Sequence, residues 1–164
     1  MRVTEMPVDF ADTERASSDV HGGTLAAVAS VISQMDEAGK AEWSPTYIMT
    51  ADDAPAVTVT VKTKITMPRW SEYGTACQAE KGEWDRFFAA LETHEQGHID
   101  LVRQHLGGID EQMAGQSSDG AKQLWVSALQ DLQSASDSYD ADTDHGRNQG
   151  TVIDVSVGTQ PSSG

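Results

Sequence analysis

Hydrophobic and polar residues repeat along this chain with two different periods, which separate predicted strands from predicted helices. Over residues 57–67, apolar side chains occupy nearly every odd position and threonine or lysine the even ones. Such alternation predicts a half-buried strand. Residues 42–50 predict a second strand, and a turn over residues 52–55 would join the two as an antiparallel pair. Residues 68–70 are expected to end the clearer strand, whereas residues 11–23 are polar and rich in turn formers.

Three further stretches show the helical period. Residues 25–35 predict a helix that begins after Thr24, a suitable N-cap. A long amphipathic helix is predicted from Glu83 to at least Leu106, with a kink or end at Gly107 and a continuation toward residue 114. Another helix is predicted over residues 119–139. The expected fold class is α+β, with a small antiparallel sheet packed on the long helix and on an antiparallel partner helix.

Length and composition restrict the function further. The 164 residues fit one domain, expected over residues 1–155, followed by a flexible C-terminal tail at 156–164. A formal net charge of −15 argues against nucleic acid or an anionic membrane as a partner. No apolar run is long enough for a membrane span, and no signal peptide is expected at the first residues. Cys77 is the single cysteine, which excludes an intrachain disulfide and a cysteine-rich zinc site.

The long predicted helix carries the sequence His-Glu-Gln-Gly-His at residues 94–98. Residues four apart lie on nearly the same face of a helix, so His94 and His98 can converge on one metal ion. Glu95 would then serve as the base that activates a water. The alternative is two core histidines hydrogen bonded to carboxylates. Gly97 favours the metal, because glycine inside a helix costs about 1 kcal/mol relative to alanine and indicates close approach of another backbone or a ligand.

A catalytic zinc needs a third protein ligand. His105 is too distant, since seven residues beyond His98 correspond to about 10 Å along a helix. An antiparallel helical hairpin with its turn at residues 115–118 would instead place His98 opposite residue 135 and His94 opposite Tyr139. The stretch that follows Tyr139 would therefore reach the two histidines. His145 is the preferred third ligand, and the alternatives are Asp140, Asp142 and Asp144.

The chain also resembles a bacterial family of predicted, typically secreted zinc-dependent proteases, catalogued as a domain of unknown function. The resemblance covers roughly residues 40–150. The residues that carry it are Pro68-Arg69-Trp70, Trp84 with Phe87 and Leu91, the His94 to His98 motif, and Tyr139-Asp140-x-x-Thr143-x-His145-Gly146-x-x-Gln149-Gly150.

This resemblance implies a secreted or cell-envelope protein with a zincin-like fold. It implies that His94, His98 and His145 hold Zn²⁺, that Glu95 is the catalytic base, and that Tyr139 is an oxyanion donor. The expected activity is zinc-dependent hydrolysis of a peptide or protein substrate, with the substrate held as an extra strand along a sheet edge by analogy with such enzymes. The rival hypotheses are a non-catalytic module stabilised by zinc and a helical interaction domain without metal.

Overall fold

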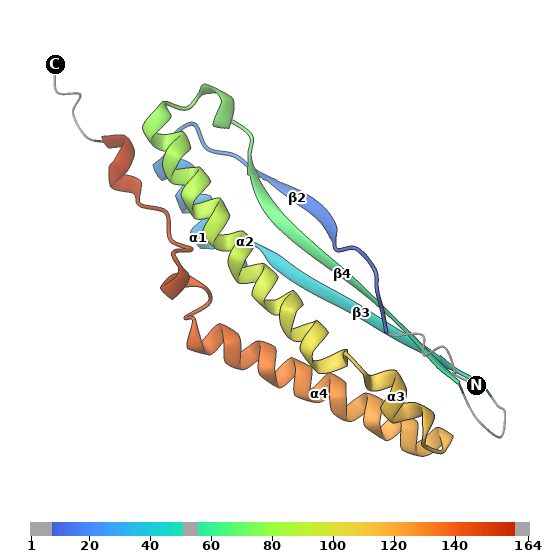
Figure 1. The fold of residues 1–164 in the computed structure, drawn as a ribbon. Coiled ribbons are helices and arrows are strands. Elements are labelled where there is room, and N and C mark those ends of the chain that lie inside the picture. The colour runs from blue at the N-terminus through green and yellow to red at the C-terminus, as the bar shows by residue number, and fades with distance from the viewer. Residues whose placement is uncertain (1–7, 51–55, 160–164) are drawn as a thin grey trace.

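A computed structural model describes residues 8–50 and 56–159, and Figure 1 shows their arrangement. A mixed sheet is covered on one face by a long helix, α2, and a second long helix, α4, lies along α2. In chain order, the strands and helices are β1 (Asp9–Phe10), β2 (Glu14–Val20), α1 (Leu25–Gln34), β3 (Lys40–Met49), β4 (Val57–Trp70), α2 (Gln78–Leu106), α3 (Ile109–Ala114) and α4 (Ser118–Asp142), with 3₁₀ turns at Tyr73–Thr75, Arg147–Gln149 and Val155–Thr159.

The sheet is organised around β4, which is 14 residues long. One edge of β4 pairs with β3 in the predicted antiparallel arrangement. The other edge pairs in parallel first with β1 and then with β2, so the prediction of an all-antiparallel sheet is wrong. Strand β2 escaped prediction because it is an edge strand whose side chains are mostly exposed on both faces. The turn predicted at residues 52–55 lies outside the described residues.

Strand β4 also continues through Pro68, where the sequence predicted its end. In an antiparallel pair, alternate residues point their N–H and C=O groups to opposite edges of the strand. Ala11 N donates to Val61 O at 3.1 Å, so odd residues of β4 face β1 and β2. Pro68 therefore faces the β3 side, where pairing has already ended at Thr66. The missing N–H of Pro68 costs no bond of the sheet.

The same alternation defines the outer edge of β3. Its even residues bond to β4, since Thr50 N donates to Ala56 O at 3.0 Å and this register holds along the whole pair. Ala41 and Trp43 thus direct their backbone groups away from β4, toward an edge that no described strand occupies. Pro45 is the next odd residue and has no N–H to offer there.

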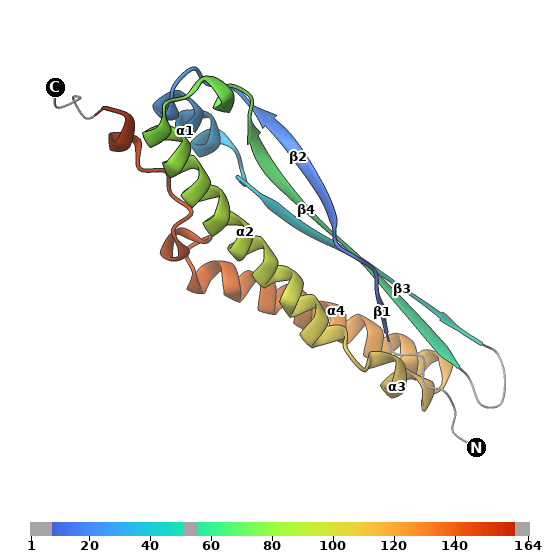
Figure 2. The ribbon, with the colours of Figure 1, turned by 45° about the horizontal axis from the view of Figure 1, so that its top comes forward.

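Two apolar clusters join the sheet to the helices. One lies at the end of the sheet where β3 and β4 meet α3, α4 and the last turns of α2. The other joins α1, the far half of β4 and the first half of α2. Figure 2 shows α2 lying between the sheet and α4. The predicted break after Leu106 is confirmed, because Gly108 adopts a left-handed conformation with φ of +79° before α3 begins.

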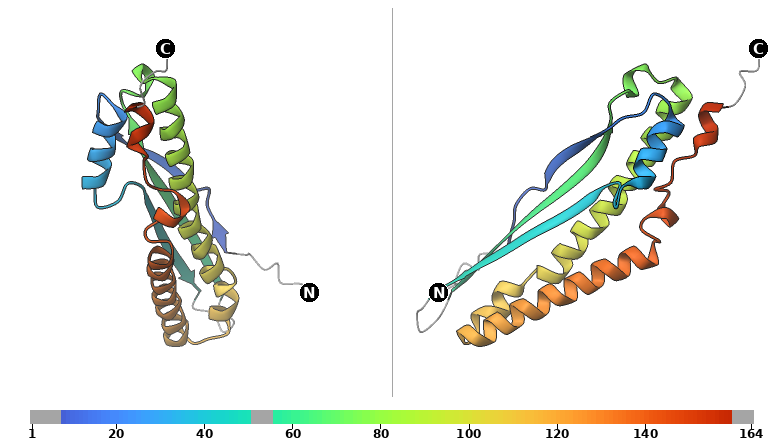
Figure 3. Two further views of the ribbon diagram at one scale, coloured as in Figure 1. Left: turned by 90° about the vertical axis from the view of Figure 1, so that its left-hand side faces the viewer. Right: turned by 180° about the vertical axis from the view of Figure 1, so that it is seen from behind.

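Beyond α4 the chain continues past the first half of α2, and Val155–Thr159 contacts both α2 and α1 (Figure 3). Residues 152–155 are not a strand, and Val155–Thr159 forms a 3₁₀ turn in which Val157 packs on the second cluster. Residues 156–159 of the predicted tail thus belong to this turn, and residues 160–164 lie outside the described part. Among the helices that the structure describes, none has the length and apolar character needed to cross a bilayer.

Candidate metal centre

The two helices α2 and α4 bring the predicted motif and its partners together. His94 and His98 lie on the buried face of α2 and are both nearly inaccessible to solvent. The sequence predicted that His98 lies opposite residue 135 and His94 opposite Tyr139. This alignment of the two helices is confirmed to within a residue, because His98 meets Ser136 and His94 stacks on Tyr139. The antiparallel hairpin predicted from the helical period is thus the arrangement that builds the site.

Asp140 is the group that joins the two histidines. Its Oδ1 lies 3.0 Å from His94 Nε2 and 2.9 Å from His98 Nε2. The three residues have potential ligand atoms that lie within 4.8 Å of one another, and their side chains form the one such group found among the described residues. Two imidazoles and a carboxylate are a donor set typical of catalytic zinc.

The hydrogen bonds behind His94 determine which of its nitrogens is free. The Tyr139 hydroxyl donates its one proton to His94 O at 3.1 Å, so its oxygen accepts from Gln149 Nε2 at 3.0 Å. Gln149 Oε1 must then face His94 Nδ1, which donates to it at 2.8 Å. A neutral imidazole has a single N–H, so Nε2 presents a lone pair to Asp140, which is also an acceptor. A cation between these atoms would satisfy both.

His98 has a similar environment. Its Nδ1 lies 2.6 Å from Ser136 Oγ, and its Nε2 faces the same oxygen of Asp140. Burial lowers the pKa of His98, and this effect exceeds the opposing influence of Asp140. The imidazole is thus held in its neutral form, which is the form that binds metal.

Gly97 does permit a close approach, but of a side chain rather than of the backbone or ligand that its sequence position suggested. A Cβ built at residue 97 would lie only 2.5 Å from Tyr139 Cζ and 3.1 Å from its Cε1. The Tyr139 ring stacks on His94 with centroids 5.0 Å apart and an interplanar angle of 13°. Its hydroxyl is engaged with His94 O and Gln149, and Tyr139 does not line the cavity formed by the described residues. In this structure Tyr139 supports His94, and its role as an oxyanion donor stays a prediction.

The loop after α4 positions Gln149, and it does not bring His145 to the other two histidines. Asp144 and His145 have positive φ angles of 50° and 55°, and His145 N donates to Asp140 O at 2.7 Å. The His145 side chain is exposed at the border of the cavity. Gly146 follows with φ of +87°, and a Cβ there would lie 2.9 Å from His94 Cγ. Of the predicted third ligands, the structure brings only Asp140 to the two histidines.

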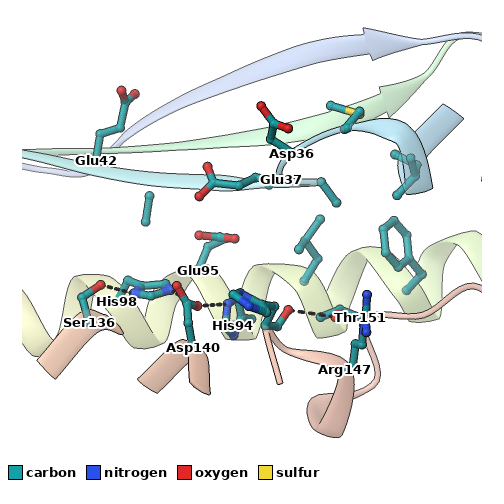
Figure 4. Close-up of a pocket in the computed structure, with 18 of the residues that line it drawn as sticks. Asp36, Glu37, Glu42, His94, Glu95, His98, Ser136, Asp140, Arg147 and Thr151 are labelled. Carbon is teal, nitrogen blue, oxygen red and sulfur yellow. Dashed lines mark hydrogen bonds and ion pairs between the residues drawn. The ribbon is translucent and has the colours of Figure 1, made fainter. Parts of the chain in front are cut away.

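Glu95 points into an open cavity of about 1340 Å³ that lies above the motif (Figure 4). Its exposure is 5%, and it makes no hydrogen bond with any described residue. Burial raises its pKa to about 7, with further contributions from the charges of Glu37 and Asp140. Gly39 allows the loop before β3 to come this close, since a Cβ there would lie 3.2 Å from Glu95 Oε1.

The opposite wall of the cavity comes mainly from the first 45 residues, together with residues 62–64 of β4, and sequence reasoning named none of these residues as a site residue. The loop after α1 contributes Asp36 and Glu37, and β3 contributes residues 41–44. Figure 4 shows Glu37 and Glu95 facing one another across the cavity. Sequence reasoning also gave no role to Ser136, although it lies one helical turn before Asp140, a spacing that could have revealed it.

A comparison with protein families is consistent with this architecture. The family described as "Bacterial protein of unknown function (DUF922)" matches residues 16–146, which include both histidines of the motif and Asp140. Since this match covers most of the chain, the protein belongs to that family. No curated protein and no solved structure matched the chain.

The contact between Gly97 and Tyr139 predicts opposite effects for two glycine substitutions in α2. Gly97→Ala is expected to destabilise the fold by about 1–3 kcal/mol, because the overlap with Tyr139 outweighs the gain in helix propensity. Gly82→Ala is the matched control, since a Cβ there meets no atom within 4 Å, and it should stabilise by up to about 1 kcal/mol. Urea unfolding measures both. Equal stabilisation by the two substitutions would contradict the contact.

Proposed function

We propose that this DUF922 member is a zinc-dependent peptidase in which His94, His98 and Asp140 hold the metal and Glu95 is the general base. The observation that carries the proposal is the convergence of two imidazole nitrogens and one carboxylate oxygen, beside a buried carboxylate that has no partner among the described residues. The family match is compatible with this function but does not assign one.

The residues around the three ligands fit zinc. Each imidazole has its Nδ1 occupied, by Gln149 and by Ser136, which orients Nε2 toward the metal position. Carboxylate and neutral imidazole are ordinary zinc ligands, and three protein ligands leave a position for water. Bound zinc supplies Lewis-acid chemistry, which acidifies water and polarises a carbonyl oxygen.

Glu95 is placed to move the proton in such a reaction. Its carboxylate follows the first ligand in sequence and points into the cavity rather than at Asp140. A raised pKa suits a group that must accept a proton from water and return it to the leaving amine.

The free edge of β3 supports an extended peptide as the substrate. The backbone groups of Ala41 and Trp43 point away from β4, and both residues line the cavity that contains Glu95. A peptide added to this edge would lie between β3 and α2, with its main chain hydrogen bonded to the sheet. Pro45 offers no N–H, so the usable edge ends there, and the cavity lining ends beside it at Ser44.

The rival function is a zinc site closed by a fourth side chain, which would stabilise the fold without turnover. Asp144, the candidate from sequence, is exposed and forms an ion pair with Arg147 at 3.9 Å. The cavity beside the three ligands and the free carboxylate of Glu95 favour the catalytic alternative. The two functions make different predictions for Glu95.

Glu95→Gln is expected to retain zinc and to lower the rate of peptide hydrolysis by about 10²–10⁴-fold, the usual contribution of a general base. Hydrolysis is measured with a library of internally quenched peptides, and zinc by elemental analysis. Glu92→Gln is the control, because Glu92 lies on the exposed face of α2, where it pairs with Arg15. Turnover unaffected by Glu95→Gln would exclude the base, and zinc without turnover in the unmodified protein would favour the closed structural site.

Zinc affinity distinguishes the candidates for the third ligand. Loss of a residue that supports a metal ligand lowers metal affinity by roughly 10–100-fold. Asp140→Asn removes a proposed ligand and is expected to weaken zinc binding by more than this. His145→Ala is expected to leave zinc binding nearly unchanged. Competition with a chelator measures both. Asp137→Asn is the charge-matched control, since Asp137 lines the same cavity on α4 but is not in the ligand group. The reverse ranking would make His145 the ligand.

A further inference from the structure

One ion pair holds the last described stretch of the chain against α2. Arg86 Nε and Nη2 donate to the two carboxylate oxygens of Glu83, at 2.6 and 2.7 Å. The same guanidinium donates to Gly150 O at 2.9 Å and to Val152 O at 2.6 Å. Glu83 Oε2 in turn accepts the N–H of Asp154 at 2.6 Å. The pair therefore fixes three backbone groups within residues 150–154.

These backbone contacts begin at the residue after Gln149, whose Oε1 accepts from His94 Nδ1. Gly150 has φ of +98°, and a Cβ there would lie 3.0 Å from Arg86 Nη1. On the other side, Gly146 packs against the His94 ring. Gln149 is thus held between two fixed points of the loop, one of them provided by Arg86.

The chemistry of the pair suits a positioning role better than a stabilising one. The Glu83 side chain is only 7% exposed, and the hydrogen bonds from Arg86 keep its pKa below the usual range. The Arg86 side chain is 47% exposed, so water screens the pair and it contributes little net stability. The planar guanidinium, however, fixes several acceptors in a defined geometry, which an ammonium group does not.

We propose that Glu83 and Arg86 are positioning residues for the metal centre. They hold Gln149 on Nδ1 of His94, and thereby keep Nε2 of that histidine directed at the metal position beside Asp140. This inference rests on the proposed metal ligands, but it does not depend on whether the centre hydrolyses peptides.

The test is a double-mutant cycle on zinc affinity. Arg86→Gln and Gln149→Ala should each weaken binding by about tenfold, the lower end of the range for residues that orient a metal ligand. Because arginine acts through glutamine, the double variant should bind zinc as well as Gln149→Ala alone. Arg86→Lys keeps the charge and the fold but should not restore affinity. Arg15→Gln, which breaks the 3.4 Å pair between Arg15 of β2 and Glu92 of α2, should have no effect.

Two results would overturn the proposal: zinc affinity unchanged in Arg86→Gln, or losses that multiply in the double variant, as expected of a general weakening of the fold. Amide hydrogen exchange in the metal-free protein gives a second readout. The Asp154 N–H and its neighbours at residues 149–153 should exchange faster in Arg86→Gln than in Arg15→Gln. If the unmodified protein binds no zinc, the proposed function fails, while equal exchange in these variants would show separately that the pair does not hold this loop.

Discussion

The approach of α4 to α2 at Gly97 is the constraint on which the candidate site depends. With no side chain at this position, the Tyr139 ring lies directly on the backbone of α2 and stacks on His94. One helical turn separates Ser136 from Asp140, as it separates His98 from His94, so a single fixed contact aligns both pairs. A larger spacing between the helices would separate every donor in the centre from its acceptor.

The charges around the cavity favour a bound cation. Carboxylates from three separate elements face the same space, because Glu37 lies on the loop before β3, Glu95 on α2 and Asp140 on α4. Like charges in a partly buried cavity oppose folding unless something compensates them. The net charge of −15 offers no nearby excess of cations to do so. A bound divalent ion would reduce this cost, and the imidazoles of His94 and His98 would provide the remaining ligands.

The sequence was sufficient for the parts of the site that follow from helical geometry. The period of the apolar residues predicted the hairpin, and equal rise along its arms placed residues 136–140 beside the motif. The helical period did not decide which residue after Tyr139 would join the two histidines as the third ligand. His145 was preferred as a residue type, yet the positive φ angles at residues 144–146 use its backbone to turn the chain and leave its side chain outside. No local sequence pattern predicts this turn, because its shape depends on the packing of the loop against His94.

The parts contributed by the sheet were harder to predict. Strands β1 and β2 both pair in parallel with the long strand β4. The paired residues lie about 50 positions apart in the chain, so no local pattern predicts the pairing. The acidic wall at residues 36–37 shows no motif of its own and gains its place only because Gly39 lets the loop approach Glu95.

Pro45 has a consequence for the protein in concentrated solution. An uninterrupted strand edge is a template on which a second chain can form a continuous sheet, and this is a common start of aggregation. In β3, proline divides the outward-facing backbone groups into two short pieces, with Ala41 and Trp43 on one side and Tyr47 and Met49 on the other. The piece beside the cavity is long enough for a short extended peptide. Neither piece reaches the roughly six residues of a typical fibril-forming segment, so proline at position 45 protects this open edge against indiscriminate association.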